Sequence, residues 1–121
     1  MPRIAIKNAK IITPLEKIDN GIILINGQLI EAVGPADEIS IPKNIKIIDT
    51  LGLIACPGFI DLHIHGAKGF DFIDADSVSI TEILKYHFYH GTMSLLATLI
   101  IESDSKIKDV LREVMSYEND I

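Results

Sequence analysis

The chain has 121 residues, of which 48% are hydrophobic and 23% are charged, and its formal net charge is −6 at pH 7. This composition is typical of a globular protein and excludes a disordered chain. The acidic balance argues against a general nucleic-acid binder, which would carry a basic patch. The single cysteine, Cys56, excludes an internal disulfide framework and fits a reducing compartment.

The first 56 residues predict an all-β segment of short strands. Each candidate strand is a run rich in isoleucine, leucine or valine, bounded by glycine, proline, asparagine or aspartate. These runs lie at residues 4–12, 22–25, 29–33, 45–49 and 53–56.

Turn residues separate these strands. Asp19-Asn20-Gly21 predicts a turn before the second strand. Asn26-Gly27 predicts a β-hairpin over residues 22–33, because a type I′ turn needs positive φ at both of its central positions. Residues 36–44 are polar and interrupted by Pro42, so we expect a loop there.

The pattern changes after Pro57. Residues 59–64 form a nearly continuous apolar run, which predicts a strand buried on both sides. Residues 66–76 predict a long loop. A second buried strand is expected over residues 92–101.

Two helices complete this half. Ser79 and Glu82 have the spacing of a capping box, with Ser79 at the N-cap, and Gly91 is expected to end that helix in the left-handed conformation. The last helix is expected to begin at Ser103 or Ser105. The residues spaced for apolar faces are Ile80, Ile83, Leu84, His87 and Phe88 in the first helix and Ile107, Val110, Leu111, Val114 and Met115 in the second.

The order strand, helix, strand, helix after residue 56 is the repeating unit of an α/β fold with a parallel sheet. We therefore divide the chain into an all-β domain over residues 1–56 and two βα units over residues 57–121. A closed eightfold barrel needs about 250 residues, so a barrel would be incomplete in this chain.

The candidate site lies at the end of the strand at 59–64. His63 and His65 are spaced i, i+2, so on a strand their side chains point to the same face. Imidazole nitrogens suit Zn²⁺ and similar ions, and α/β folds place their sites at the carboxyl ends of strands. The sequence therefore predicts that His63 and His65 are metal ligands; two satisfied histidines in a sheet are the alternative.

Two further residues are candidates for supporting roles at this site. Asp61 shares the face of the histidines and is expected to orient one of them or to satisfy backbone amides rather than to bind metal. Thr98, on the next strand, is expected to face the same strand end.

The remaining polar candidates are expected to have structural roles. Asp71, Asp74 and Asp76 are interpreted as turn and capping residues, His87 as a core or interface histidine, and His90 as a helix C-terminal cap. No glycine-rich phosphate motif and no serine nucleophile elbow occurs in the sequence. No catalytic residue is assigned within this chain.

Three segments carry a resemblance to a known family. They are residues 57–66 (Pro-Gly-Phe-Ile-Asp-Leu-His-Ile-His-Gly), residues 69–75 (Gly-Phe-Asp-Phe-Ile-Asp-Ala) and residues 90–100 (His-Gly-Thr-Met-Ser-Leu-Leu-Ala-Thr-Leu-Ile). The first resembles the amidohydrolase superfamily, and the other two resemble its N-acetylglucosamine-6-phosphate deacetylase family. Met93 and Ala97 depart from the family pattern, which often has threonine and proline there.

The resemblance implies a (β/α)₈ barrel joined to a small β-sandwich, and one or two divalent metal ions, zinc or iron, that activate water to attack the acetamide of an amino-sugar phosphate. The complete enzyme is expected to be a homodimer, and the acidic net charge predicts no nucleic-acid partner. A cytoplasmic location without a membrane partner is expected from the single cysteine and from the lack of a signal-peptide pattern or a long apolar run. The glutamate, the two further histidines and the aspartate that such enzymes use come from later strands. The chain is therefore expected to be an N-terminal fragment, inactive alone.

Two alternatives stay open at this stage. The first is another reaction of the same superfamily, by a cyclic amidase or a deaminase. The second is a small non-enzymatic α/β module that binds a partner or holds a metal structurally.

Overall fold

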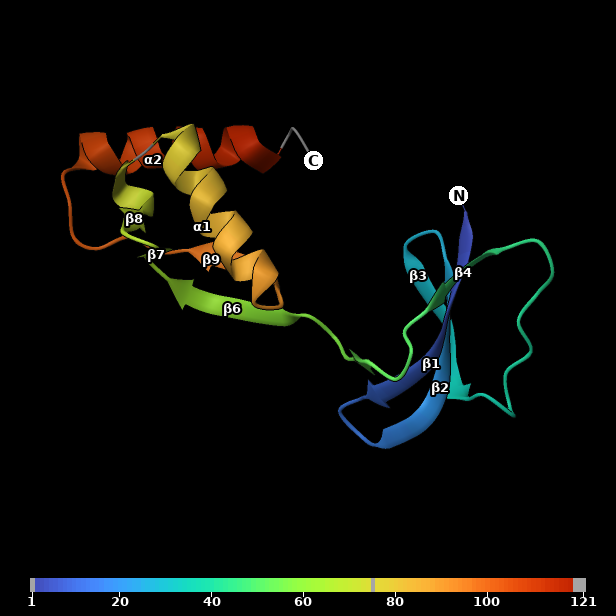
Figure 1. Ribbon diagram of the computed structural model, residues 1–121. Helices are drawn as coiled ribbons and strands as arrows, with labels where there is room; N and C mark the ends of the chain where they lie inside the picture. Colours follow the sequence, from blue (N-terminus) through green and yellow to red (C-terminus); the bar gives the residue numbers. More distant parts are fainter. Residues whose placement is uncertain (1, 75, 119–121) are drawn as a thin grey trace. The chain divides into compact units, whose positions relative to one another are not determined.

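A computed structural model describes residues 2–74 and 76–118, and the chain divides into two compact units, Met1–Pro57 and Gly58–Ile121. Within residues 2–57 all the regular elements are strands, whereas the second unit combines strands and helices (Figure 1). The expected mixed α/β content is therefore confirmed.

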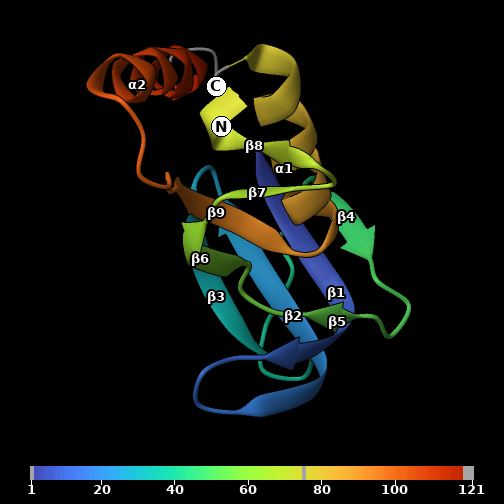
Figure 2. The same ribbon diagram turned by 90° about the vertical axis from the view of Figure 1, so that its left-hand side faces the viewer.

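The first unit is built on one sheet with the strand order β3-β2-β1-β4. Strand β1 pairs antiparallel with β2 and parallel with β4 and β5, and β2 pairs antiparallel with β3 (Figure 2). Two clusters of buried side chains line this sheet, one centred on Ala5 and the other on Ala9. The strands are β1 (Arg3–Ile12), β2 (Lys17–Asn26), β3 (Leu29–Pro35), β4 (Lys46–Asp49) and β5 (Ile54–Ala55).

The predicted hairpin is present, but its turn differs from the expected type. Asn26 pairs with Leu29, so the two loop residues are Gly27 and Gln28. Of these two, only Gly27 has a positive φ, at 63°. A positive φ at the first loop residue alone suits a type II′ turn, so the expectation of type I′ is wrong.

The turn expected at Asp19-Asn20-Gly21 is also wrong, because β2 continues through these residues. Asn20 has a φ of 51°, and the pairing register of β2 with β1 shifts beside Gly21, which marks a β-bulge. A Cβ atom on Gly21 would lie 2.3 Å from Cδ1 of Ile11, so the bulge accommodates a buried isoleucine of the neighbouring strand.

The second unit contains a βαβ arrangement. Strand β6 (Phe59–Ile64) has the predicted bounds and pairs in parallel with β9 (Thr92–Ala97). Strand β9 is shorter than expected because its partner ends at Ile64. Helix α1 (Ser77–Tyr89) connects the two strands, and α2 (Asp104–Glu118) follows β9 (Figure 1).

The expectation that β6 is buried on both sides is wrong. Ile60 and Leu62 are 69% and 66% exposed, whereas Ile64 is 8% exposed and packs against Phe72 and Ile83. The physical reason is that the described apolar cluster packs around Ile64, at the carboxyl end of β6, and includes neither Ile60 nor Leu62.

Residues 66–76 are more ordered than the predicted loop. Strands β7 (Gly66–Ala67) and β8 (Phe70–Asp71) form a small antiparallel ladder, followed by the 3₁₀ helix η1 (Phe72–Asp74). The ladder depends on Gly66, because a Cβ atom there would lie 2.0 Å from the carbonyl oxygen of Phe70.

The start of α1 also differs from the prediction. The N-cap is Asp76, whose Oδ1 accepts hydrogen bonds from the backbone N–H groups of Val78 and Ser79 at 3.0 and 2.9 Å. Ser79 is buried inside the first turn and donates its hydroxyl to Asp76 Oδ2 at 2.6 Å, so it does not cap the helix. At the other end, Gly91 has a φ of 92°, as predicted.

Helix α2 begins directly after Ser103, one of the two predicted starts, and the Ser103 carbonyl accepts the N–H of Ile107 at 3.0 Å. Its apolar face is buried only in part, since Val110 is 1% exposed and Leu111 is 51% exposed. Tyr117 ties α2 to α1 by donating its hydroxyl to the carbonyl of Ser77 at 2.8 Å.

Candidate metal centre

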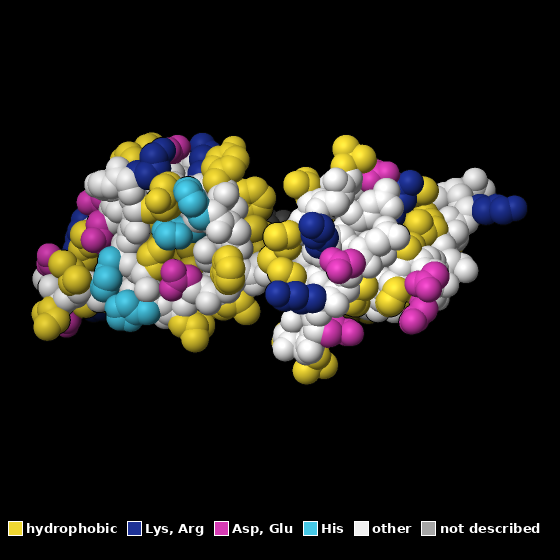
Figure 3. Space-filling view, turned by 60° about the horizontal axis from the view of Figure 1, so that its bottom comes forward, with side chains coloured by type: hydrophobic (Ala, Val, Ile, Leu, Met, Phe, Trp, Pro, Cys, Tyr) yellow, Lys and Arg dark blue, Asp and Glu magenta, His cyan; other side chains and the backbone are white. Residues whose placement is uncertain are grey.

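The two histidines of the candidate site lie at the end of β6. His63 belongs to the strand and His65 follows it directly. Their ring centroids are 5.1 Å apart, in keeping with residues i and i+2 that share one face of a strand, and the two rings are nearly perpendicular. His63 is exposed and His65 is half-buried, and histidine side chains are visible on the surface of the second unit in Figure 3.

His65 is held by the residue that follows β9. Its Nδ1 lies 3.1 Å from the backbone carbonyl oxygen of Thr98. A carbonyl oxygen only accepts, so Nδ1 carries the hydrogen and the Nε2 lone pair of the neutral ring is left for another partner.

Thr98 is itself attached to β6. Its backbone N–H and its hydroxyl both donate to the carbonyl oxygen of Ile64, at 2.9 and 2.8 Å. These contacts join the carboxyl ends of the two parallel strands beside the histidine pair.

Asp61 turns toward the backbone of its own strand. Its Oδ1 accepts a hydrogen bond from the N–H of His63 at 3.1 Å, and the side chain is half-buried. One carboxylate oxygen is thus engaged by the peptide that carries His63.

The histidine pair offers two donors to a metal ion. Within residues 2–74 and 76–118, no group of three or more histidine, cysteine, aspartate or glutamate side chains is close enough to hold one. Two imidazole rings on one strand face suit zinc or iron. One of these rings, that of His65, has its second nitrogen bonded to a backbone carbonyl, as is usual for histidines that bind metal. The residues therefore fit part of such a site, and a structural or catalytic zinc needs at least one more protein ligand.

The aspartates after β6 serve local structure. Asp74 Oδ2 accepts the N–H of Asp71, and Asp71 Oδ1 accepts the N–H of Ile73, both at 2.9 Å. The hydroxyl of Ser79, followed by the backbone N–H groups at the start of α1, lowers the pKa of Asp76. The turn and capping roles expected of these three residues match these bonds.

The two histidines of α1 differ in their surroundings. His90 is the C-cap, and its Nδ1–H donates to the carbonyl of Tyr86 at 2.7 Å, in keeping with the predicted role. His87 is half-buried, and its Nε2 is buried with no hydrogen-bond partner within the described residues.

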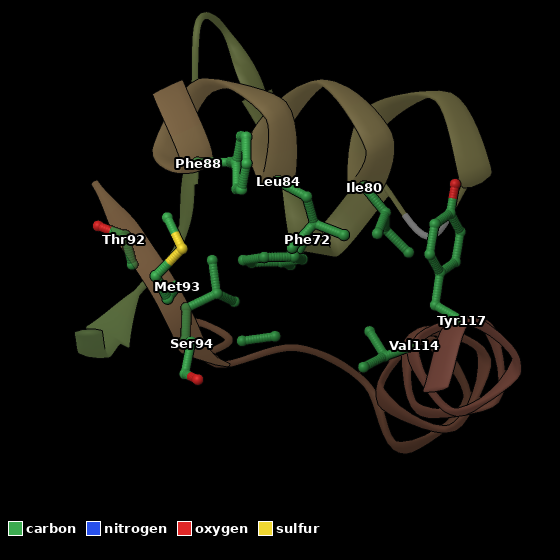
Figure 4. Close-up of a pocket in the computed structure, with 11 residues that line it drawn as sticks. Phe72, Ile80, Leu84, Phe88, Thr92, Met93, Ser94, Val114 and Tyr117 are labelled. Carbon is green, nitrogen blue, oxygen red and sulfur yellow. The ribbon is translucent and has the colours of Figure 1, made fainter. Parts of the chain in front are cut away.

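A separate cavity of about 420 Å³ lies between α1, β9 and α2 (Figure 4). Its wall is mainly apolar and includes Phe72, Leu84, Met93 and Val114, and neither His63 nor His65 lines it. The cavity is therefore a gap in the packing of the helices on the sheet, away from the candidate metal site.

Some features of the site could not be read from the sequence. The pattern of residues pointed to Thr98. However, the atom that bonds to His65 Nδ1 is the backbone carbonyl oxygen of Thr98, which every residue type carries. The double use of the Ile64 carbonyl likewise depends on how β6 and β9 align, and no residue pattern reports it.

Several known proteins are similar to this chain in sequence. No protein-family model matches the chain. The N-acetylglucosamine-6-phosphate deacetylase of Haemophilus influenzae is 35% identical over 116 residues, which cover 95% of this chain and 30% of that protein. The deacetylase of the same name from Bacillus subtilis is 36% identical over 107 residues, 88% of this chain and 26% of that protein.

A solved structure of N-acetylglucosamine-6-phosphate deacetylase from Pasteurella multocida superposes with a TM-score of 0.76 and 28% identity. The match covers 98% of this chain and 31% of that one. A shorter match is to a dihydroorotase from Elusimicrobium minutum, which is 46% identical over 63 residues. These residues cover 50% of this chain and 13% of that protein.

The chain thus spans about 30% of the length of the first of these relatives. No helix within the described residues is long and apolar enough to cross a membrane. In sequence and in fold alike, the chain resembles the N-terminal part of N-acetylglucosamine-6-phosphate deacetylases, as the sequence motifs had indicated.

Proposed function

We propose that this chain provides the N-terminal part of a metal-dependent N-acetylglucosamine-6-phosphate deacetylase. Such an enzyme hydrolyses N-acetylglucosamine 6-phosphate to glucosamine 6-phosphate and acetate. The observation that carries the proposal is the His63–His65 pair at the carboxyl end of β6, in a chain that aligns over 95% of its length with a deacetylase.

The two units have distinct places in this proposal. The sheet of Met1–Pro57 contributes strands to a small β-sandwich, and Gly58–Ile121 supplies the first two βα units of a (β/α)₈ barrel. Barrel enzymes carry their active sites at the carboxyl ends of the strands, and this is where β6 places His63 and His65.

His63 and His65 would hold a divalent ion, zinc or iron, with one or two ions per complete subunit. The chemistry supplied by the bound ion is activation of a water molecule for attack on the acetamide carbonyl at neutral pH. His65 would bind through Nε2, because its Nδ1–H is committed to Thr98. Asp61 restrains the backbone of His63 through its hydrogen bond to that N–H.

The other partners follow from the proposed reaction. The substrate is a small amino-sugar phosphate, and the complete enzyme works as a cytoplasmic homodimer without nucleic acid. The net charge of −6 is in keeping with a protein that does not bind nucleic acid.

The test is to assay the natural gene product for release of acetate from N-acetylglucosamine 6-phosphate. We expect metal-dependent turnover that His63→Gln and His65→Gln each reduce at least 100-fold, as estimated from the loss of one metal ligand. His90→Gln is the matched control, because His90 is an exposed helix cap, and it should retain activity. Absence of turnover in a folded, metal-loaded protein would contradict the proposal.

A second candidate is hydrolysis of a cyclic amide, and the match to dihydroorotase over half of the chain favours it as the alternative. The same protein should be assayed for ring opening of dihydroorotate. Ring opening without acetate release would select this alternative, whereas metal binding alone would not distinguish the two.

A further inference from the structure

We propose that Thr98 is a positioning residue that sets His65 to bind metal through Nε2, by holding Nδ1–H on its backbone carbonyl. This inference rests on the proposed function, since it concerns the same metal site. It adds a residue that would act on the metal site through His65.

The first step is the direction of the hydrogen bond. The Thr98 carbonyl oxygen lies 3.1 Å from Nδ1 of His65 and is able only to accept. The bond therefore selects the neutral tautomer with hydrogen on Nδ1 and limits rotation of the ring. Because metal ions bind the unprotonated nitrogen, the Nε2 lone pair is prepared for a ligand before any ion arrives.

The second step is what holds the carbonyl in place. The N–H and the hydroxyl of Thr98 both donate to the carbonyl of Ile64, at 2.9 and 2.8 Å. Ile64 immediately precedes His65. Thr98 therefore bonds both to the backbone just before His65 and to the His65 imidazole. The hydroxyl is the part of this arrangement that a substitution is able to remove.

The third step is the contrast with His63. The ring nitrogens of His63 make no hydrogen bond within residues 2–74 and 76–118, although its backbone N–H is bonded to Asp61. One histidine of the pair is thus oriented in advance and the other is not. His90 provides a comparison, because its Nδ1–H also donates to a carbonyl, that of Tyr86, but at an exposed helix end.

The test begins with the metal-free chain. Long-range ¹H–¹⁵N spectra at a pH of about 8.5, above the ordinary imidazole pKa, report which ring nitrogen carries hydrogen. We expect the Nδ1–H form at His65 and His90, and a mixture of tautomers at His63. Single histidine-to-glutamine variants assign the signals. A His65 ring with hydrogen on Nε2 would overturn the inference.

The matched variants are Thr98→Val, which keeps the branched shape and loses the hydroxyl, and Thr98→Ser, which keeps the hydroxyl. We expect Thr98→Val to mix the tautomers of His65 and to raise the Kd for Zn²⁺ about tenfold, the lower range for loss of a residue that orients a ligand. Thr98→Ser should restore both readouts. Circular dichroism checks that each variant keeps its helices and strands.

The outcomes separate the inference from the proposed function. If Zn²⁺ shifts the ring signals of His63 and His65 equally in the wild type and in Thr98→Val, with the tautomer unchanged, the positioning role is wrong and the metal site stands. If Zn²⁺ leaves both rings unperturbed while His65 holds the Nδ1–H form, the metal site fails, and the role of Thr98 in metal binding fails with it.

Discussion

His65 and Thr98 are 33 residues apart in the sequence, yet Nδ1 of His65 lies 3.1 Å from the carbonyl oxygen of Thr98. The parallel pairing of β6 and β9 brings them together, because each residue directly follows the carboxyl end of its strand. The hydrogen bond that orients His65 therefore depends on the folded βαβ unit. Metal binding and the stability of this unit test that dependence.

Zinc binding by the chain of 121 residues alone is expected to be weak, because within residues 2–74 and 76–118 no third histidine, cysteine, aspartate or glutamate joins His63 and His65 to hold a metal ion. For the same reason, no release of acetate from N-acetylglucosamine 6-phosphate is expected. Calorimetric titration with Zn²⁺ and an acetate assay are the measurements. His63→Gln and His65→Gln should abolish the weak binding, and His90→Gln should preserve it. Turnover by the chain alone would contradict this expectation.

Replacing Gly66 should destabilise the segment that follows His65. A Cβ atom there would lie 2.0 Å from the carbonyl oxygen of Phe70, which is backbone and is unable to rotate away. We expect Gly66→Ala to lower the free energy of unfolding of the second unit by about 2 kcal/mol or more.

Gly69→Ala is the matched control, since Gly69 has a φ of 85° and open space around its Cα. Its cost should be about 1 kcal/mol, from the left-handed conformation alone. Urea unfolding curves compare the two variants with the wild type. Equal effects of Gly66→Ala and Gly69→Ala would show that the close approach to Phe70 is relieved cheaply.

The cap of α1 should make stability depend on pH. The Ser79 hydroxyl, then the backbone N–H groups of Ser79 and Val78, lower the pKa of Asp76 in the folded chain. A carboxyl with a lowered folded pKa stabilises the fold fully above its ordinary pKa, about 3.9, and this contribution is lost as the pH falls through the lower folded value.

Thermal melting between about pH 7 and pH 2 should therefore show a smaller acid-induced drop in Tm for Asp76→Asn than for the wild type. Asp76→Asn should also melt at lower temperature near neutral pH. Ser79→Ala removes the first contribution to the shift and should fall between the two. Parallel profiles for the wild type and Asp76→Asn would exclude Asp76 as the source of the pH dependence.

The buried Nε2 of His87 is expected to cost stability rather than supply it. This atom has no hydrogen-bond partner within the described residues, and an unpaired buried polar atom is unfavourable. His87→Leu should leave the free energy of unfolding unchanged or raise it by up to about 1 kcal/mol.

His90→Leu provides the comparison, because it breaks the bond from Nδ1–H to the carbonyl of Tyr86 and should destabilise the chain slightly. Chemical denaturation measures both variants. A loss of stability in His87→Leu larger than that in His90→Leu would mean that His87 makes a favourable polar contact in solution.

Sequence reasoning succeeded where a feature depends on neighbours along the chain. The twofold period of a strand is enough to place His63 and His65 on one face, and β6 has the predicted bounds. Gly91 ends α1 with a positive φ because glycine accepts that conformation without steric cost.

Local patterns failed where several residues compete for one role. Ser79 and Glu82 match a capping box, but Asp76 captures the free N–H groups one turn earlier, and Ser79 bonds to Asp76 instead. At Asn20-Gly21 the dipeptide suits a turn, and pairing with β1 converts it into a bulge within a continuous strand.

By itself, the sequence determined that two histidines share a strand end and that the chain resembles amidohydrolases, because residue type and spacing carry both facts. Tertiary structure decided which carbonyl receives the His65 Nδ1–H and left Ile60 and Leu62 exposed on a two-stranded sheet. The hydrogen bond depends on which backbone groups the pairing of β6 with β9 brings close to His65. The exposure of Ile60 and Leu62 depends on which described side chains pack against β6.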